Sequence, residues 1–126
     1  MKQIFLEDFA NADDVYRHFD EDPGKEHILL AWYGYGNYSG AAFVVFELDG
    51  KLYEINGSHC SCYGLEGQWD PEETTVKALR YRMTQGALGH GDDWYSGSAF
   101  GGQLEECLKE FEKEFPEKPV AIDYVI

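Results

Sequence analysis

Two short apolar runs on either side of one polar dipeptide form the clearest pattern in the chain. Residues 41–48 and 51–56 are rich in apolar side chains, and Asp49-Gly50 lies between them. An Asp-Gly pair in this position is typical of a type I′ β-hairpin, because both central residues of that turn need a positive φ. The sequence therefore predicts a hairpin in which these residues face each other: Phe46 and Tyr53, and Val44 and Ile55.

Two amphipathic segments predict helices towards the two ends of the chain. In residues 11–19 apolar side chains recur at positions i, i+3, i+4 and i+7, and Asn11 can cap the first turn. Residues 103–115 show the same apolar stripe, and Pro116 would end that helix because proline lacks a backbone donor. The stripe includes Cys107, which we therefore expect in the core.

A third helix and two further strands are predicted from shorter signals. Asp70 can act as an N-cap and Pro71 suits the first helical position, so we expect a helix over residues 70–83. Residues 27–33 and 120–126 have the apolar runs and the alternation of strands. These strands would extend the sheet that the hairpin begins.

Length and composition fit one α+β domain. The chain has 126 residues, of which 44% are hydrophobic, enough for a single core. We expect a single domain over residues 1–126, a small antiparallel sheet around the hairpin 41–56 packed with about three helices. Residues 27–46 contain no Asp, Glu, Lys or Arg and should be core, interface or both. The glycine-rich stretch 86–102 is expected to be a loop. Loops of this length in compact domains are often functional or mobile.

The charge of the chain excludes several classes of partner. Asp and Glu number 24 against 10 Lys and Arg, which gives a net charge of −14. Such a surface repels phosphate, so direct binding of nucleic acid is not expected. No run approaches the length of a membrane span, and Glu7 and Asp8 lie where a signal peptide needs apolar residues. With an odd number of cysteines, best explained as free thiols, we expect a cytoplasmic protein without a membrane partner.

Surplus carboxylates on the first and last helices suggest a surface for a basic protein partner, although charged faces of this kind also serve solubility alone. The alternation of Tyr and Gly in residues 33–40 predicts rings that pack on the sheet or anchor a partner. The segment lacks the Gly-Lys-Ser/Thr ending of a phosphate-binding loop. The candidate partner-binding residues are Asp13, Asp14, Asp20, Glu21, Asp22 and Glu26 near the first helix, Glu105, Glu106, Glu110 and Glu112 on the last, and Tyr35, Tyr38 and Trp94 as aromatic anchors.

His59, Cys60 and Cys62 form the densest group of chemically active residues. In an extended backbone Cys60 and Cys62 point to the same side and could share a zinc ion, with His90 as a distant further ligand. The Cys-x-Cys spacing is unusual for zinc, so two alternatives stay open. One is a thiol nucleophile with His90 as its base, although the negative charge tends to raise a thiol pKa. The other is that the cysteines are small buried hydrophobes. No other cofactor is expected.

The run Asn-Gly-Ser-His-Cys-Ser-Cys-Tyr-Gly-Leu-Glu-Gly-Gln-Trp at residues 56–69 resembles a group of small phage and bacterial proteins, as do residues 38–40 and 49–54. No established activity comes with this resemblance, so it assigns no catalytic residue. It implies a setting instead. Small acidic proteins of phages and mobile elements often occupy the basic nucleic-acid groove of a host protein, sometimes as mimics of DNA.

Charge, size and resemblance together predict a binding protein in preference to an enzyme. The expected function is that of a phage-type or mobile-element-type inhibitor, of the anti-CRISPR, anti-restriction or DNA-mimic kind, which engages a basic nucleic-acid-handling host protein. The alternative is a metal- or thiol-dependent protein built on His59, Cys60 and Cys62, with residues 86–102 as a lid. A housekeeping structural protein without a partner is the third possibility.

Overall fold

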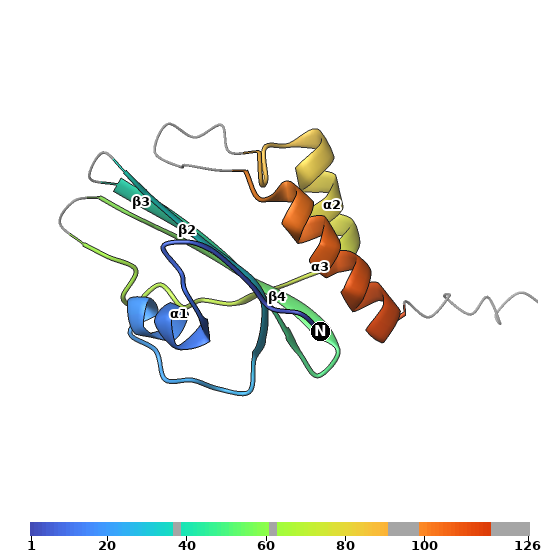
Figure 1. The fold of residues 1–126 in the computed structure, drawn as a ribbon, viewed down its shortest axis with the longest axis horizontal. Coiled ribbons are helices and arrows are strands. Elements are labelled where there is room, and N and C mark those ends of the chain that lie inside the picture. Colours follow the sequence, from blue (N-terminus) through green and yellow to red (C-terminus); the bar gives the residue numbers. More distant parts are fainter. Residues whose placement is uncertain (37–38, 61–62, 91–98, 117–126) are drawn as a thin grey trace, which may run out of the picture.

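A five-stranded sheet forms the centre of the computed structural model, which describes residues 1–36, 39–60, 63–90 and 99–116 (Figure 1). The strands lie in the order β1-β2-β3-β4-β5. β1 pairs parallel with β2, and all other neighbouring strands pair antiparallel. The elements follow each other as β1 (Ile4–Glu7), α1 (Ala12–Phe19), β2 (His27–Gly36), β3 (Ser39–Leu48), β4 (Lys51–His59), β5 (Glu72–Thr74), α2 (Val76–Gln85) and α3 (Gly101–Glu114).

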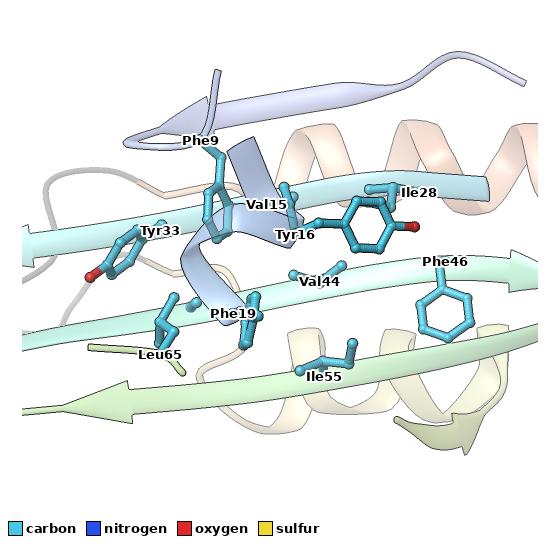
Figure 2. Close-up of a cluster of buried hydrophobic side chains, with 12 residues drawn as sticks. Phe9, Val15, Tyr16, Phe19, Ile28, Tyr33, Val44, Phe46, Ile55 and Leu65 are labelled. Atoms are coloured by element: carbon cyan, nitrogen blue, oxygen red, sulfur yellow. The ribbon is translucent and has the colours of Figure 1, made fainter. Parts of the chain in front are cut away.

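Helices cover both faces of the sheet, so the chain forms three layers (Figure 1). α1 packs on one face together with Leu65 (Figure 2), and Trp69 packs against the same cluster. We call this the α1 face. α2 and α3 cover the opposite face, the α2/α3 face. The uncharged stretch 27–46 supplies β2 and most of β3, which is why both faces of the central strands are apolar. The α+β class with helices around a central hairpin is confirmed.

The predicted hairpin is confirmed in its turn and its register. Asp49 and Gly50 have φ angles of 53° and 80°, and both lie in the positive region that a type I′ turn requires. Glu47 fixes the turn, because its carboxylate accepts a hydrogen bond of 2.8 Å from the Gly50 amide. The predicted partners also face each other, with Phe46 opposite Tyr53 and Val44 opposite Ile55.

The first and last helices agree closely with the sequence pattern. Asn11 caps α1, because its side chain accepts a hydrogen bond of 2.8 Å from the Asp14 amide. α3 begins two residues earlier than predicted, at Gly101, and its expected stripe is in the core. Cys107 is buried there, as expected. The predicted strand 120–126 and residues 91–98 of the expected loop lie outside the described residues.

The predicted start of the middle helix is wrong. Residues 72–74 form β5, which pairs with the outer edge of β4, and α2 begins only at Val76. Thr75 is the true N-cap, and its hydroxyl accepts a hydrogen bond of 3.0 Å from the Ala78 amide. The free backbone groups of the β4 edge therefore outweigh the capping signal of Asp70 and Pro71.

Further along β4, a side chain takes the place of a neighbouring strand. The Gln68 side chain accepts a hydrogen bond of 2.9 Å from the Ser58 amide and donates one of 2.8 Å to the Ser58 carbonyl. Gln68 also donates to the Gly64 carbonyl, which ties the segment after β4 to the sheet.

In the part of the chain that the structure describes, no helix is long and apolar enough to cross a membrane.

A buried carboxylate joins the sheet to α2. The Glu54 side chain on β4 is only 5% exposed, and it accepts hydrogen bonds of 2.7 and 2.8 Å from the guanidinium of Arg82. Asn56 donates a further bond of 2.8 Å. Burial raises the pKa of Glu54, but the hydrogen bonds and charge of Arg82 outweigh it, so the net pKa lies below the ordinary value of 4.5. The pair therefore keeps Glu54 ionised inside the protein.

Removal of the Arg82 side chain should reveal this dependence. We expect Arg82→Ala to lower the free energy of unfolding by about 3 kcal/mol, because Glu54 then stays buried without a partner. The native protein keeps the stabilising contribution of Glu54 above its lowered pKa and loses it as the pH falls through that pKa. In the variant the Asn56 bond remains, but burial, the largest cause acting on the pKa of Glu54, is no longer opposed by Arg82. The pKa of Glu54 should then rise, and stability should instead fall as the pH rises. Urea unfolding across the acidic range measures both effects.

The matched control is Arg17→Ala on α1. The Arg17 side chain is 70% exposed and pairs with Asp14, so its loss should change the free energy of unfolding by less than about 1 kcal/mol. Equal losses in the two variants would contradict the assigned role of Glu54.

Candidate functional site

The two predicted groups of carboxylates lie on opposite sides of the sheet. α1 and the turn after it belong to the α1 face, whereas α3 lies on the α2/α3 face (Figure 1). The sheet and its two apolar layers lie between the two groups. Each group must therefore be considered by itself.

Two carboxylates of the α1 group hold the α1 layer together. Asp14 accepts a hydrogen bond of 3.0 Å from the Ala10 amide and pairs with Arg17. The bond from Ala10 lowers the pKa of Asp14, and Arg17 adds to this effect. Glu26 accepts a hydrogen bond of 2.7 Å from the Tyr16 hydroxyl. These two predicted partner-binding residues are therefore occupied within the protein.

The remaining carboxylates of the α1 group are free to meet a partner. Asp13, Asp20, Glu21 and Asp22 are exposed, and no side chain among the described residues bonds to them. Their backbone is nevertheless fixed. Asp20 adopts the left-handed conformation and its amide bonds to the Arg17 carbonyl at 3.1 Å, and the Glu21 amide bonds to the Tyr16 carbonyl at 3.0 Å. We call these four residues the α1 acidic patch.

The α3 group is more strongly occupied. Arg80 of α2 binds Glu105 at 2.6 Å and Glu112 at 2.8 Å, so both carboxylates serve to join the two helices. The hydrogen bond from Arg80 lowers the pKa of Glu105. Glu110 accepts a bond of 3.2 Å from the Lys2 amide, and Glu106 is exposed. Sequence reasoning missed this pairing, because nothing local connects Arg80 with residues on another helix.

Of the three predicted aromatic anchors, the structure describes Tyr35. It lies on the α1 face and is 53% exposed. Its ring packs on His59, with 5.5 Å between the ring centroids, and meets the edge of Tyr33 at 6.4 Å. Tyr38 and Trp94 lie outside the described residues.

The Tyr35 ring packs on two side chains, Tyr33 and His59, that are joined by a hydrogen bond. The His59 ring bonds through Nδ1 to the Cys60 carbonyl at 2.9 Å and through Nε2 to the Tyr33 hydroxyl at 2.5 Å. A carbonyl only accepts, so Nδ1 carries the proton and the Tyr33 hydroxyl donates to Nε2. Burial raises the pKa of Tyr33 to about 12, with help from the negative charge of Asp8. Tyr33 therefore stays protonated and acts as a donor.

Gly40 makes room for this pair. It faces His59 across the β3–β4 pair, and a Cβ atom there would lie 2.6 Å from Nε2 of His59 and 3.0 Å from Cε1 of Tyr33. The first contact is shorter than a carbon atom tolerates and the second is tight, so glycine is favoured here for lack of space, not for an unusual backbone angle. The alternation of Tyr and Gly in residues 33–40 is the sequence signal that could have identified this arrangement.

The structure describes part of the predicted zinc or thiol site, namely His59, Cys60 and His90. Both ring nitrogens of His59 are occupied, and His90 lies on the other side of the sheet, where its Nε2 is 2.6 Å from the Met83 carbonyl. Cys60 is exposed, and Cys62 lies outside the described residues. Among the residues that the structure describes, no three side chains of His, Cys, Asp or Glu gather as metal ligands.

Substitution of Gly40 tests the geometry of the pair. Gly40→Ala should displace His59 from the Tyr33 hydroxyl and lower the free energy of unfolding by about 1–2 kcal/mol. The shift of the His59 ring nitrogens in NMR spectra would report the lost hydrogen bond. As the control, Gly102 in α3 has no atom within 4 Å of an added Cβ. Gly102→Ala should therefore leave His59 unchanged and slightly stabilise the helix. Unchanged nitrogen shifts in Gly40→Ala would contradict the assigned geometry.

The two described cysteines should differ in reactivity. Cys60 is exposed, whereas burial raises the pKa of Cys107 to about 12, and its thiol donates to the Leu29 carbonyl at 3.3 Å. We expect iodoacetamide to label Cys60 in the folded protein and Cys107 only after unfolding in urea, as read by peptide mass spectrometry. Labelling of Cys107 at the same rate as Cys60 in the native state would disprove its burial.

Comparison with known proteins provides no relative on which to model this site. The chain matches no family model, no curated protein and no solved structure. The resemblance of residues 56–69 to phage and bacterial proteins therefore stays a prediction from the sequence. What the chain does must follow from the geometry and charge of its own residues.

Proposed function

We propose that this chain is a non-enzymatic binding protein that engages the basic surface of another protein through its α1 face. The observation that carries the proposal is the α1 acidic patch: four exposed carboxylates without side-chain partners among the described residues, in a chain of net charge −14. The same face presents Tyr35, an aromatic residue of the kind that anchors interfaces. Charge then guides the encounter, and the ring provides contact area.

The α1 face suits this role better than the α2/α3 face. On α3, Arg80 already pairs with both Glu105 and Glu112, and Lys109 and Lys113 lie on the same helix. The exposed basic residues beside the α1 acidic patch are Arg17, which pairs with Asp14 outside the patch, and Lys25, which follows it. A positive partner surface would therefore meet a stronger negative potential at α1.

The class of partner follows from charge. Proteins that handle nucleic acid present Lys and Arg towards phosphates, and a rigid acidic protein can compete for that surface. In its specific form, the proposal is that this chain is a phage or mobile-element product that inhibits such a host protein. This form rests on the resemblance of residues 56–69. Separation of the two acidic groups limits the mimicry of DNA to one face of the chain.

Pull-down of purified nucleic-acid-binding proteins at rising salt tests the proposal. Binding should weaken as salt rises, because exposed charges are screened beyond a Debye length of about 10 Å at 0.1 M. Asp20→Asn with Asp22→Asn should weaken binding by about tenfold. The matched control, Glu106→Gln with Glu114→Gln, removes the same charge from exposed positions of α3 and should have little effect.

Two outcomes would contradict the proposal. Binding that is insensitive to salt would remove the electrostatic argument. Equal weakening by the α1 and α3 double variants would show that net charge alone, and not the α1 acidic patch, attracts the partner. Far-UV circular dichroism of both variants confirms that the fold is intact before binding is compared.

A further inference from the structure

Tyr35 differs from the other exposed tyrosines in what supports its ring. From its packing on Tyr33 and His59 we infer that Tyr35 forms an arginine site, in which the exposed side of its ring stacks on a guanidinium group of the partner. The inference rests on the proposed function and names the side chain that the α1 face would recognise. Three features of the structure support it: the supported ring, the rigid base below it and the nearby carboxylates.

The ring of Tyr35 is supported from the protein side and open towards solvent. It lies tilted on His59 at 32° and nearly perpendicular to Tyr33 at 80°, yet it remains 53% exposed. An aromatic ring that is already held in place loses little conformational freedom when a partner binds. The entropy cost of ordering the Tyr35 side chain on binding is therefore small.

The base below the ring is rigid. Tyr33 and His59 are joined by their hydrogen bond, and Gly40 leaves the space that they fill. Tyr33 also packs against Phe9 (Figure 2) and against the ring of His18, with a centroid distance of 5.2 Å to each. The base formed by Tyr33 and His59 therefore connects β2 and β4 with the α1 layer.

The electrostatic surroundings favour a cation over the ring. Asp8 and Glu66 are exposed. Burial is the main cause of the raised pKa of Tyr33, and the negative charges of both carboxylates raise it further. Asp8 is anchored by its amide, which bonds to the Tyr33 carbonyl at 3.1 Å. A positive group near these carboxylates gains from both charges and from the negative face of the aromatic ring. An anionic or neutral group gains neither.

Arginine fits this surface better than lysine. Its guanidinium is planar and weakly hydrated, so it can stack on a ring and still direct its N–H groups sideways to carboxylates. The ammonium group of lysine is a strongly hydrated point charge that stacks poorly. The partner surface should therefore present arginine at the position that meets Tyr35.

Oligo-arginine and oligo-lysine peptides of equal length, measured by isothermal titration calorimetry, test the inference. The native chain should bind oligo-arginine more tightly than oligo-lysine. Tyr35→Leu keeps an apolar residue on β2 but removes the aromatic face, so it should weaken oligo-arginine binding about threefold to tenfold and abolish the preference. Tyr35→Phe should keep most of the preference, because the ring remains.

Tyr81 provides the matched control. It lies on α2 and is 66% exposed, more than Tyr35, but no ring of the described residues packs against it. Tyr81→Leu should therefore leave the affinity for both peptides unchanged. Equal weakening by Tyr35→Leu and Tyr81→Leu would overturn the inference, as would native affinity for oligo-arginine in Tyr35→Leu.

The test also separates this inference from the proposed function. If the native chain binds both peptides, loses affinity with rising salt and is unaffected by Tyr35→Leu, the arginine site is wrong while the acidic binding face stands. If the native chain binds neither peptide at low salt, the proposed function fails and the arginine site fails with it.

Discussion

Burial of the central strands on both faces is the constraint on which this structure depends. β2 and β3 come from a stretch without Asp, Glu, Lys or Arg, and their side chains fill two separate apolar layers. A sheet of this kind can fold only if helices cover both sides. The surplus carboxylates must then lie on the outer surfaces of those helices and of the turns between them, so the three-layer arrangement itself divides the charge into two groups.

The chain uses its few basic residues within this arrangement. Arg82 pairs with Glu54, the buried carboxylate among the described residues, and Arg80 joins α2 to α3 through Glu105 and Glu112. Two arginines of a chain with only 10 basic residues therefore hold the α2/α3 face together. The α1 face is left with the less compensated charge, and the asymmetry follows from the internal needs of the fold.

Local signals in the sequence predicted local structure well. Elements that depend on pairing with distant residues were not predicted. Asp49-Gly50 and Asn11 act within a few residues of themselves, so the hairpin and α1 were predicted correctly. β1 was missed because four residues carry little pattern and pair with a strand more than twenty positions later. The helix predicted from Asp70 failed because the edge of β4, which lies elsewhere in the sequence, offered better hydrogen bonds. At the site, charge identified the acidic residues, but only the fold shows which are occupied and that Tyr33 meets His59.

The side chain of Gln68 has a consequence for how other chains can approach the sheet. β5 covers only three residues of β4, and beyond it the amide and carbonyl of Ser58 would be open to an added strand. Gln68 occupies both groups. Its carboxamide makes the two hydrogen bonds that a neighbouring strand would make with Ser58. β-augmentation and fibril-like stacking are therefore blocked at that residue. A partner that approaches the sheet at Ser58 must then be recognised through side chains and not through shared backbone hydrogen bonds.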